Sequence, residues 1–165
     1  MWNEKKLDLP VTPIERVANL VGIVAFTAMI TMLVLQWNQL PETIPAHFGL
    51  KGEVDRWGSK IELLILPLIG FALYALLHVL EKHPHTHNYP ARLNDANREI
   101  FYVHSRRVLN LMKNVCVLLF TYTTWRTILI AKGTASDLGM VPFSLLLIAL
   151  FAIVIWGAIG MSRIR

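Results

Sequence analysis

The sequence predicts an all-α integral membrane protein: a four-helix bundle with a structured loop between its first and second helices. Two observations predict this class. Of the 165 residues, 55% are hydrophobic and 16% are charged, whereas soluble domains carry about a quarter charged residues. Four stretches are also long enough to cross a bilayer core, which needs about 20 apolar helical residues. The single cysteine and the high apolar content argue against a disulfide scaffold and a disordered tail.

The chain is predicted to form one membrane domain, 1–165, with four spans. They cover about residues 17–37, 61–81, 108–131 and 140–161. Pro67 is expected to kink the second span. The third contains Lys113 and Arg126, each near one end, so we expect both cations to snorkel towards the interfaces. The alternative is a functional charge inside the membrane, for which Arg126 is the candidate.

Lysines and arginines are distributed unevenly between the two predicted sides. One side carries ten: Lys5, Lys6, Arg16, Lys82, Arg92, Arg98, Arg106, Arg107, Arg163 and Arg165. The other carries four: Lys51, Arg56, Lys60 and Lys132. Cytoplasmic loops are the ones enriched in Lys and Arg. We therefore expect a multi-pass protein of a bacterial inner membrane, with both termini and the loop 82–107 in the cytoplasm and the loop 38–60 outside.

The outer loop, 38–60, is predicted to be ordered. Pro41 and Pro45 favour an extended chain, and glycines such as Gly52 permit tight turns. Trp57 is typical of an anchor at the membrane interface.

Four polar side chains of this loop could converge on one binding site: His47, Asp55, Arg56 and Lys60. His47 could titrate near neutral pH or ligate a metal with a nearby carboxylate. Alternatively, Asp55 pairs with Arg56 or Lys60, and His47 bonds a loop carbonyl.

The loop also carries a longer pattern, Leu-Pro-x-x-Ile-Pro-x-His-Phe, then Gly-x-x-Asp-x-Trp-Gly-Ser-Lys and a proline-containing span. The residues that carry it are Leu40, Pro41, Ile44, Pro45, His47, Phe48, Gly52, Asp55, Trp57, Gly58, Ser59, Lys60 and Pro67. A second pattern is Asn88-Tyr89-Pro90, with Asn97 and the pair Arg106-Arg107 downstream. Over roughly residues 18–113, the chain resembles the bacterial membrane family called domain of unknown function 1648.

This resemblance implies a role at the cell envelope. Related domains form the N-terminal half of SdpI-like proteins, which confer immunity to a secreted peptide toxin and can hold a repressor at the membrane. We see no counterpart of the C-terminal membrane half of those proteins, so the resemblance implies the immunity role at the family level alone.

The cytoplasmic loop offers a candidate metal site and a basic face. His83, His85 and His87 alternate, so an extended chain would place their rings on one side, where two could chelate a divalent cation. A solvated loop is the alternative. Asn94 or Asp95 could cap a helix that continues into the third span. Its arginines, Arg98, Arg106 and Arg107, suit anionic lipid head groups or a cytosolic protein partner.

Three classes of function remain. The favoured one is a non-enzymatic envelope sensor or peptide-toxin immunity-like protein that acts through its outer loop. The alternative is a small oligomeric transporter or channel that uses Arg126, Asp137 and the threonines of the third span. An enzyme is disfavoured because the familiar catalytic motifs are missing, and His47 with Asp55 would be its acid/base pair. We expect no cofactor and no nucleic acid. The expected partners are membrane lipids, an extracellular peptide or envelope ligand, a cytosolic protein and further copies of the chain.

Overall fold

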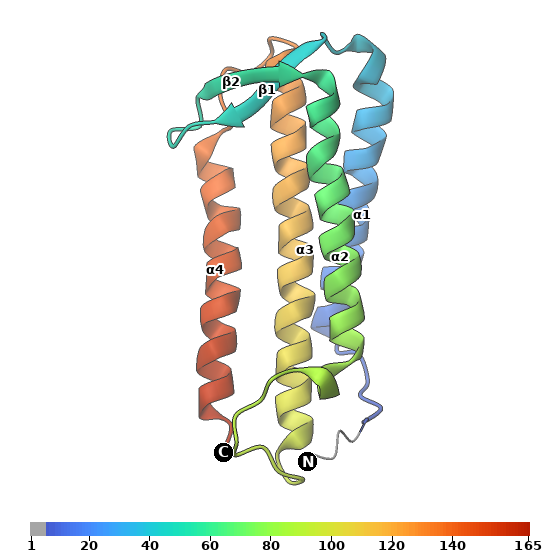
Figure 1. Cartoon of the computed structure of the whole chain (residues 1–165), viewed down its shortest axis with the longest axis vertical. Coiled ribbons are helices and arrows are strands. Elements are labelled where there is room, and N and C mark those ends of the chain that lie inside the picture. Colours follow the sequence, from blue (N-terminus) through green and yellow to red (C-terminus); the bar gives the residue numbers. More distant parts are fainter. Residues whose placement is uncertain (1–5) are drawn as a thin grey trace.

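The computed structural model describes residues 6–165, so Lys5, one of the cations used to predict orientation, lies outside the described residues. Within that range, four long helices run side by side (Figure 1). They are α1 (Pro13–Gln36), α2 (Ile65–Lys82), α3 (Arg98–Ala131) and α4 (Met140–Arg163). Each helical stretch is long and apolar enough to cross a membrane. The prediction of an all-helical membrane bundle is confirmed, and the chain is a small multi-pass membrane protein.

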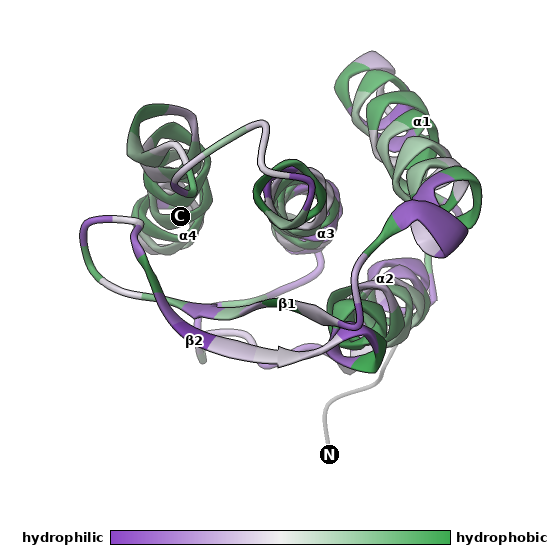
Figure 2. Ribbon diagram, turned by 90° about the horizontal axis from the view of Figure 1, so that it is seen from above, coloured by the Kyte–Doolittle hydropathy of each residue, from purple (hydrophilic) through white to green (hydrophobic). Residues whose placement is uncertain are grey.

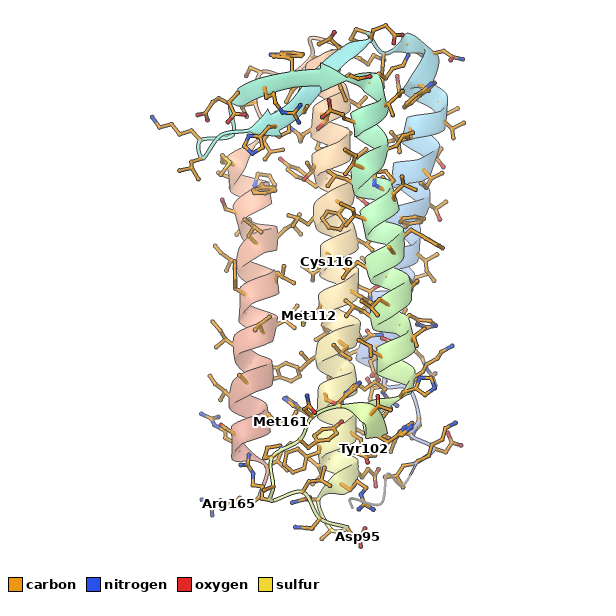
Figure 3. All side chains as sticks on the ribbon, viewed as in Figure 1. Asp95, Tyr102, Met112, Cys116, Met161 and Arg165 are labelled. Atoms are coloured by element: carbon orange, nitrogen blue, oxygen red, sulfur yellow. The ribbon has the colours of Figure 1, made fainter. Side chains whose placement is uncertain are left out.

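α3 is the central helix of the bundle. Viewed from above, it lies between α4 on one side and α1 and α2 on the other (Figure 2). α3 packs extensively against all three of its neighbours, whereas α1 and α2 have few contacts with each other. Nitrogen and oxygen atoms gather towards the two ends of the bundle, while the side chains near its middle, around Cys116, are mostly carbon (Figure 3).

A β-hairpin covers one end of the bundle, here called the hairpin end. Strand β1 (Thr43–Phe48) pairs antiparallel with β2 (Val54–Ser59), with irregular register around His47. The turn between them contains Gly52, whose φ of 82° strongly favours glycine. The amide of Leu138 donates to the carbonyl of Gly52 at 2.8 Å, which joins the turn to the segment before α4. The predicted ordered loop is therefore a two-stranded sheet.

The main apolar core lies directly beneath this hairpin. Its buried side chains come from α1, β1, α3 and the segments that flank the hairpin: Met29, Leu33, Leu40, Ile44, Leu63 and Ile128. Ile44 is buried against the helices, and this fixes which face of β1 lies on the end of the bundle. If β1 were turned over, Ile44 would be exposed.

Pro67 does not interrupt α2, contrary to the prediction of a kinked span. It is the third residue of α2 and follows a 3₁₀ turn at Lys60–Leu64. In the first turn of a helix, the missing N–H of proline leaves no bond unmade. Ser59 and Glu62 form a capping box at the start of that 3₁₀ turn, so the hairpin passes directly into the second helix.

The opposite end, here called the terminal end, holds both ends of the described chain (Figure 1). A loop connects α2 to α3 there and includes a short 3₁₀ turn, Pro84–Thr86. α3 begins at Arg98 with Asn97 as its N-cap, where the sequence predicted Asn94 or Asp95. Arg106 and Arg107 belong to this helix, as the sequence analysis expected, and it continues into the third span.

Candidate functional site

A cavity of about 510 Å³ lies beneath the hairpin, bounded by α2, α3 and α4. Its roof is the end of β1, including Pro45, His47 and Phe48. Its lower walls are mainly apolar and comprise Leu63, Leu66, Thr123, Thr127, Met140, Phe143 and Leu147. Arg56 and Glu62 add charge near the hairpin. The cavity therefore combines an apolar interior with a polar rim, the usual character of a small-ligand site.

His47 and Asp55 contact each other across the hairpin. His47 Nδ1 lies 2.7 Å from Asp55 Oδ1, and the side chains are 65% and 44% exposed. The structure brings His47 to a nearby carboxylate, as one alternative drawn from the sequence required. The other alternative, with Asp55 on Arg56 or Lys60 and His47 on a loop carbonyl, is not seen among these contacts. The carboxylate orients the imidazole and leaves its Nε2 available to a ligand.

Arg56 belongs to a separate contact that ties β2 to the start of α2. Its Nη2 donates to Glu62 Oε2 at 2.8 Å and to the carbonyl of Ala46 at 3.3 Å. The hydrogen bond that Arg56 donates to Glu62 raises the pKa of Arg56 above its ordinary value, so this guanidinium stays charged at any physiological pH. The pair closes one side of the cavity rim.

Lys60 lies at the base of the hairpin, away from His47. Its Nζ is 3.2 Å from Glu42 Oε1 and 5.2 Å from the centre of the Trp37 ring. The four polar residues expected to converge are thus divided among three contacts. Among the other motif residues, Pro45 is buried and lies opposite Trp57 in the strand register. Trp57 and Pro41 are exposed.

Arg126 closes the turn between α3 and α4 at the hairpin end. Its guanidinium donates to the carbonyl of Asp137 from Nε at 3.1 Å and from Nη2 at 2.5 Å. The Asp137 carboxylate accepts the amide of Gly139, and this bond lowers the pKa of Asp137. Both residues therefore have a structural reason for their charge, and the transporter alternative that uses them stays a prediction.

The three histidines of the terminal-end loop do not line up along a strand. Pro84 starts a 3₁₀ turn between His83 and His87, which removes the extended geometry on which the chelation hypothesis depended. His87 instead contacts Ser105 Oγ through Nδ1 and the carbonyl of Leu80 through Nε2, both at 2.9 Å. The rings of His83 and His85 lie 5.7 Å apart. Among residues 6–165, no group of three or more His, Cys, Asp and Glu side chains gathers as a metal site would require.

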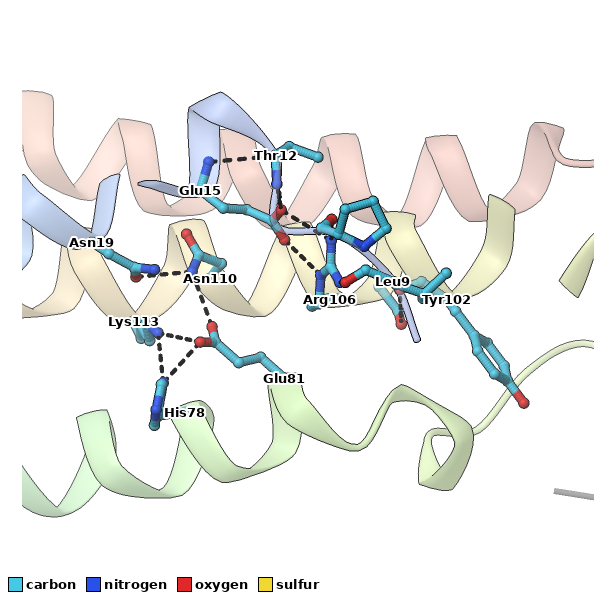
Figure 4. Close-up of polar contacts among 12 residues, drawn as sticks. Leu9, Thr12, Glu15, Asn19, His78, Glu81, Tyr102, Arg106, Asn110 and Lys113 are labelled. Carbon is cyan, nitrogen blue, oxygen red and sulfur yellow. Dashed lines mark hydrogen bonds and ion pairs between the residues drawn. The ribbon is translucent and has the colours of Figure 1, made fainter. Parts of the chain in front are cut away.

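The sequence analysis missed a buried polar network at the terminal end (Figure 4). Lys113 does not snorkel: its side chain is 0% exposed, and its Nζ donates to Glu81 Oε1 at 2.5 Å. Arg106 does not face lipid head groups either, because its Nε donates to buried Glu15 at 2.8 Å. The sequence did contain a signal for this network, because the acidic residues Glu15 and Glu81 lie near the same predicted membrane boundary as these cations.

Comparison with known proteins finds a family model that covers the hairpin. Residues 23–71, which span most of α1, the hairpin and the start of α2, match the family model "Domain of unknown function (DUF1648)". The chain is also similar to an uncharacterized protein of Archaeoglobus fulgidus, at 36% identity over 87 residues. That alignment covers 52% of this chain and 48% of the relative, so the chain matches about half of the relative's length. No solved structure matches the chain significantly.

Proposed function

We propose that the protein, whose residues 23–71 match the DUF1648 family model, is a non-enzymatic receptor of the cell membrane. It binds an amphipathic peptide beneath the hairpin, as an envelope sensor or an immunity-like protein. The single observation that carries this proposal is the cavity of about 510 Å³ that the family's hairpin roofs.

The lining of the cavity indicates the chemistry of the ligand. Leucine and phenylalanine side chains form the walls and would bury apolar side chains of a peptide. His47, Asp55 and Arg56 lie on the hairpin above them, where they would meet the polar face of the same peptide. A ligand with one apolar and one polar face satisfies both parts of the site.

The side chains of the site favour binding over catalysis. Hydroxyl groups in the cavity belong to Thr123 and Thr127, which donate to the carbonyls of Leu119 and Thr123 at 2.9 Å. They are therefore committed to their own helix and are not paired with the imidazole of His47 as an activated nucleophile would be.

The orientation belongs to the same proposal: the hairpin faces outside, and both termini face the cytoplasm. It rests on the excess of Lys and Arg on the terminal side. The positions of both ends of the described chain at the end opposite the hairpin are consistent with it.

Thiol protection in nanodiscs tests the site. In a Cys116→Ala background, Met140→Cys places the thiol in the cavity, and Val141→Cys places it on the adjacent exposed surface, where the native side chain is 74% exposed. We expect a member of a panel of synthetic amphipathic peptides to slow maleimide labelling at position 140 about tenfold and to leave position 141 unchanged. Equal protection of both thiols, or protection by no peptide, would contradict the proposal.

Hairpin variants separate binding from folding. We expect His47→Ala and Arg56→Ala to weaken the protection at position 140, because their side chains lie at the rim. Lys60→Ala is the matched control, since its contacts lie at the base of the hairpin. Loss of protein abundance in the rim variants would mean that these residues are structural.

A further inference from the structure

A second cavity, of about 520 Å³, lies at the terminal end between α1, α2, α3 and the segment that precedes α1. Polar side chains line its membrane side: Glu15, Asn19, His78, Glu81, Arg106 and Asn110. Ionisable groups inside membrane helices are costly unless they are paired or face water, and they mark functional positions for that reason. Glu15 is already satisfied by Arg106 at 2.8 Å. The polar group around Glu81 is arranged differently, because it includes a histidine, His78, whose Nδ1 has two partners.

Lys113 is held by three contacts. Its Nζ lies 2.5 Å from Glu81 Oε1, 3.2 Å from His78 Nδ1 and 4.8 Å from the centre of the Tyr74 ring. The Lys113 side chain is 0% exposed, so these contacts take the place of water. A hydrogen bond from Lys113 to His78 requires Nδ1 to be the acceptor, with the ring proton on Nε2.

The same nitrogen also contacts a second partner, which requires it to donate a hydrogen bond instead of accepting one. His78 Nδ1 also lies 2.8 Å from Glu81 Oε1 (Figure 4). A carboxylate only accepts, so this contact is a hydrogen bond only when Nδ1 carries a proton. One nitrogen cannot accept from Lys113 and donate to Glu81 at the same time. The triad therefore has two proton arrangements for one set of side-chain positions.

The terminal-end cavity extends to two members of this triad, His78 and Glu81. The His78 side chain is 39% exposed, against 9% for Glu81. Imidazole is the side chain whose charge ordinarily changes between pH 5 and 8. Other charged groups around the same cavity are Lys6, Asp8, Glu15, Lys82 and Arg106.

We propose that His78 is a proton-binding site filled from the terminal-end cavity. A proton from cavity water adds to the Nδ1 lone pair, and Glu81, which lines the cavity beside Nδ1, can carry it there. The bond from Lys113 to His78 is then replaced by a bond from His78 to Glu81, and the triad gains one positive charge. An imidazolium and an ammonium then face each other between α2 and α3, so filling the site weakens the contact between these helices. This site is independent of the peptide cavity.

Nitrogen NMR of the full chain tests the proposal directly. With ¹⁵N-labelled histidine in nanodiscs, the shifts of Nδ1 and Nε2 report which nitrogen carries a proton, and His78→Gln identifies the signals. We expect Nδ1 to be unprotonated at pH 8 and protonated at pH 5. A protonation state of Nδ1 that stays the same from pH 8 to pH 5 would overturn the proposal.

Two variants connect the titration to the triad. Glu81→Gln removes the carboxylate that accepts from protonated Nδ1, so proton affinity should fall about tenfold, a shift of about one pH unit. Lys113→Met removes the donor to Nδ1, so at pH 8 the neutral ring should already carry its proton on Nδ1. An unchanged titration in Glu81→Gln would also overturn the proposal. The wild-type titration decides it if neither variant folds.

Discussion

At the residue scale, Arg106 joins three parts of the terminal end. Its guanidinium binds Glu15 through Nε and the carbonyls of Leu9 and Pro10 through Nη1 and Nη2, all at 2.8 Å. Because these acceptors precede or begin α1, a single side chain of α3 fixes the entry of the chain into the first helix.

Replacing Arg106 by methionine should therefore be strongly destabilising. Arg106→Met leaves the buried carboxylate of Glu15 without its partner, and breaking a buried pair in this way costs about 3–5 kcal/mol. Thermal unfolding in detergent measures the loss. The double variant Glu15→Gln, Arg106→Met should recover part of the stability, because no charge then remains buried. A double variant as unstable as Arg106→Met would contradict the pairing.

His87 makes folding sensitive to acid. Burial lowers its pKa below the ordinary value of 6.5, so the unfolded chain binds a proton at a higher pH than the native protein does. The contribution of His87 to stability is therefore fully present above pH 6.5, and it is lost as the pH falls towards the lowered pKa of the native protein. Melting temperatures at pH 7.5 and 5.5 should differ less in His87→Gln than in the wild type, with His85→Gln as the control. Equal differences in all three proteins would contradict this role.

Tyr89, beside His87, makes stability depend on pH at the alkaline end instead of the acid end. Burial raises the pKa of Tyr89 to about 12, while its hydroxyl donates to the carbonyl of Pro84 at 2.7 Å. The unfolded phenol ionises near pH 10, so this residue stabilises the fold below that pH and loses its effect above it. Together, Tyr89 and His87 hold the loop against α3 through Ser105.

At the scale of elements, α4 approaches α3 closely at a buried glycine. Gly157 is buried, and a Cβ at this position would lie 2.9 Å from a methyl group of Val108. Gly157→Val should separate the two helices locally and cost about 1–3 kcal/mol, as overpacking does. Ala152→Val adds bulk on an exposed part of the same helix and should change the melting temperature little. Equal effects of the two substitutions would argue against this contact.

The hairpin shows what local sequence can and cannot predict. Its order was predictable from Pro41, Pro45 and Gly52, which restrict or bend the chain. The pairing of its charges was not, because it depends on strand register. The irregular register at His47 brings that residue to Asp55, and the passage of β2 into a 3₁₀ turn brings Arg56 to Glu62.

At the scale of the whole molecule, apolar runs in the sequence predict the number of spans and which loops share an end of the bundle. They do not predict which helices pack against each other. The burial of Lys113 depends on α2 and α3 being adjacent, which places Glu81 next to it. A span read alone shows a lysine near its end, for which snorkelling is the reasonable expectation. The partner is 32 residues away in the sequence, so no local pattern reveals it.

Orientation can be measured on intact cells with two single-cysteine variants. Leu50 lies at the hairpin turn and is 97% exposed, and Asn88 is exposed in the terminal-end loop. In a Cys116→Ala background, we expect a membrane-impermeant maleimide to label Leu50→Cys and to leave Asn88→Cys unlabelled until the cells are lysed. The reverse pattern would place the hairpin in the cytoplasm and overturn the proposed extracellular ligand.

The central place of α3 also sets the order in which the molecule can be assembled. When a growing chain delivers its first two helices to the membrane, Glu81 lacks the cation that pairs with it and Asn19 lacks its amide partner, because Lys113 and Asn110 are still to be synthesised. A carboxylate without a partner is poorly tolerated in lipid. We therefore expect this end of α2 to lie at the water boundary until the third helix supplies Lys113.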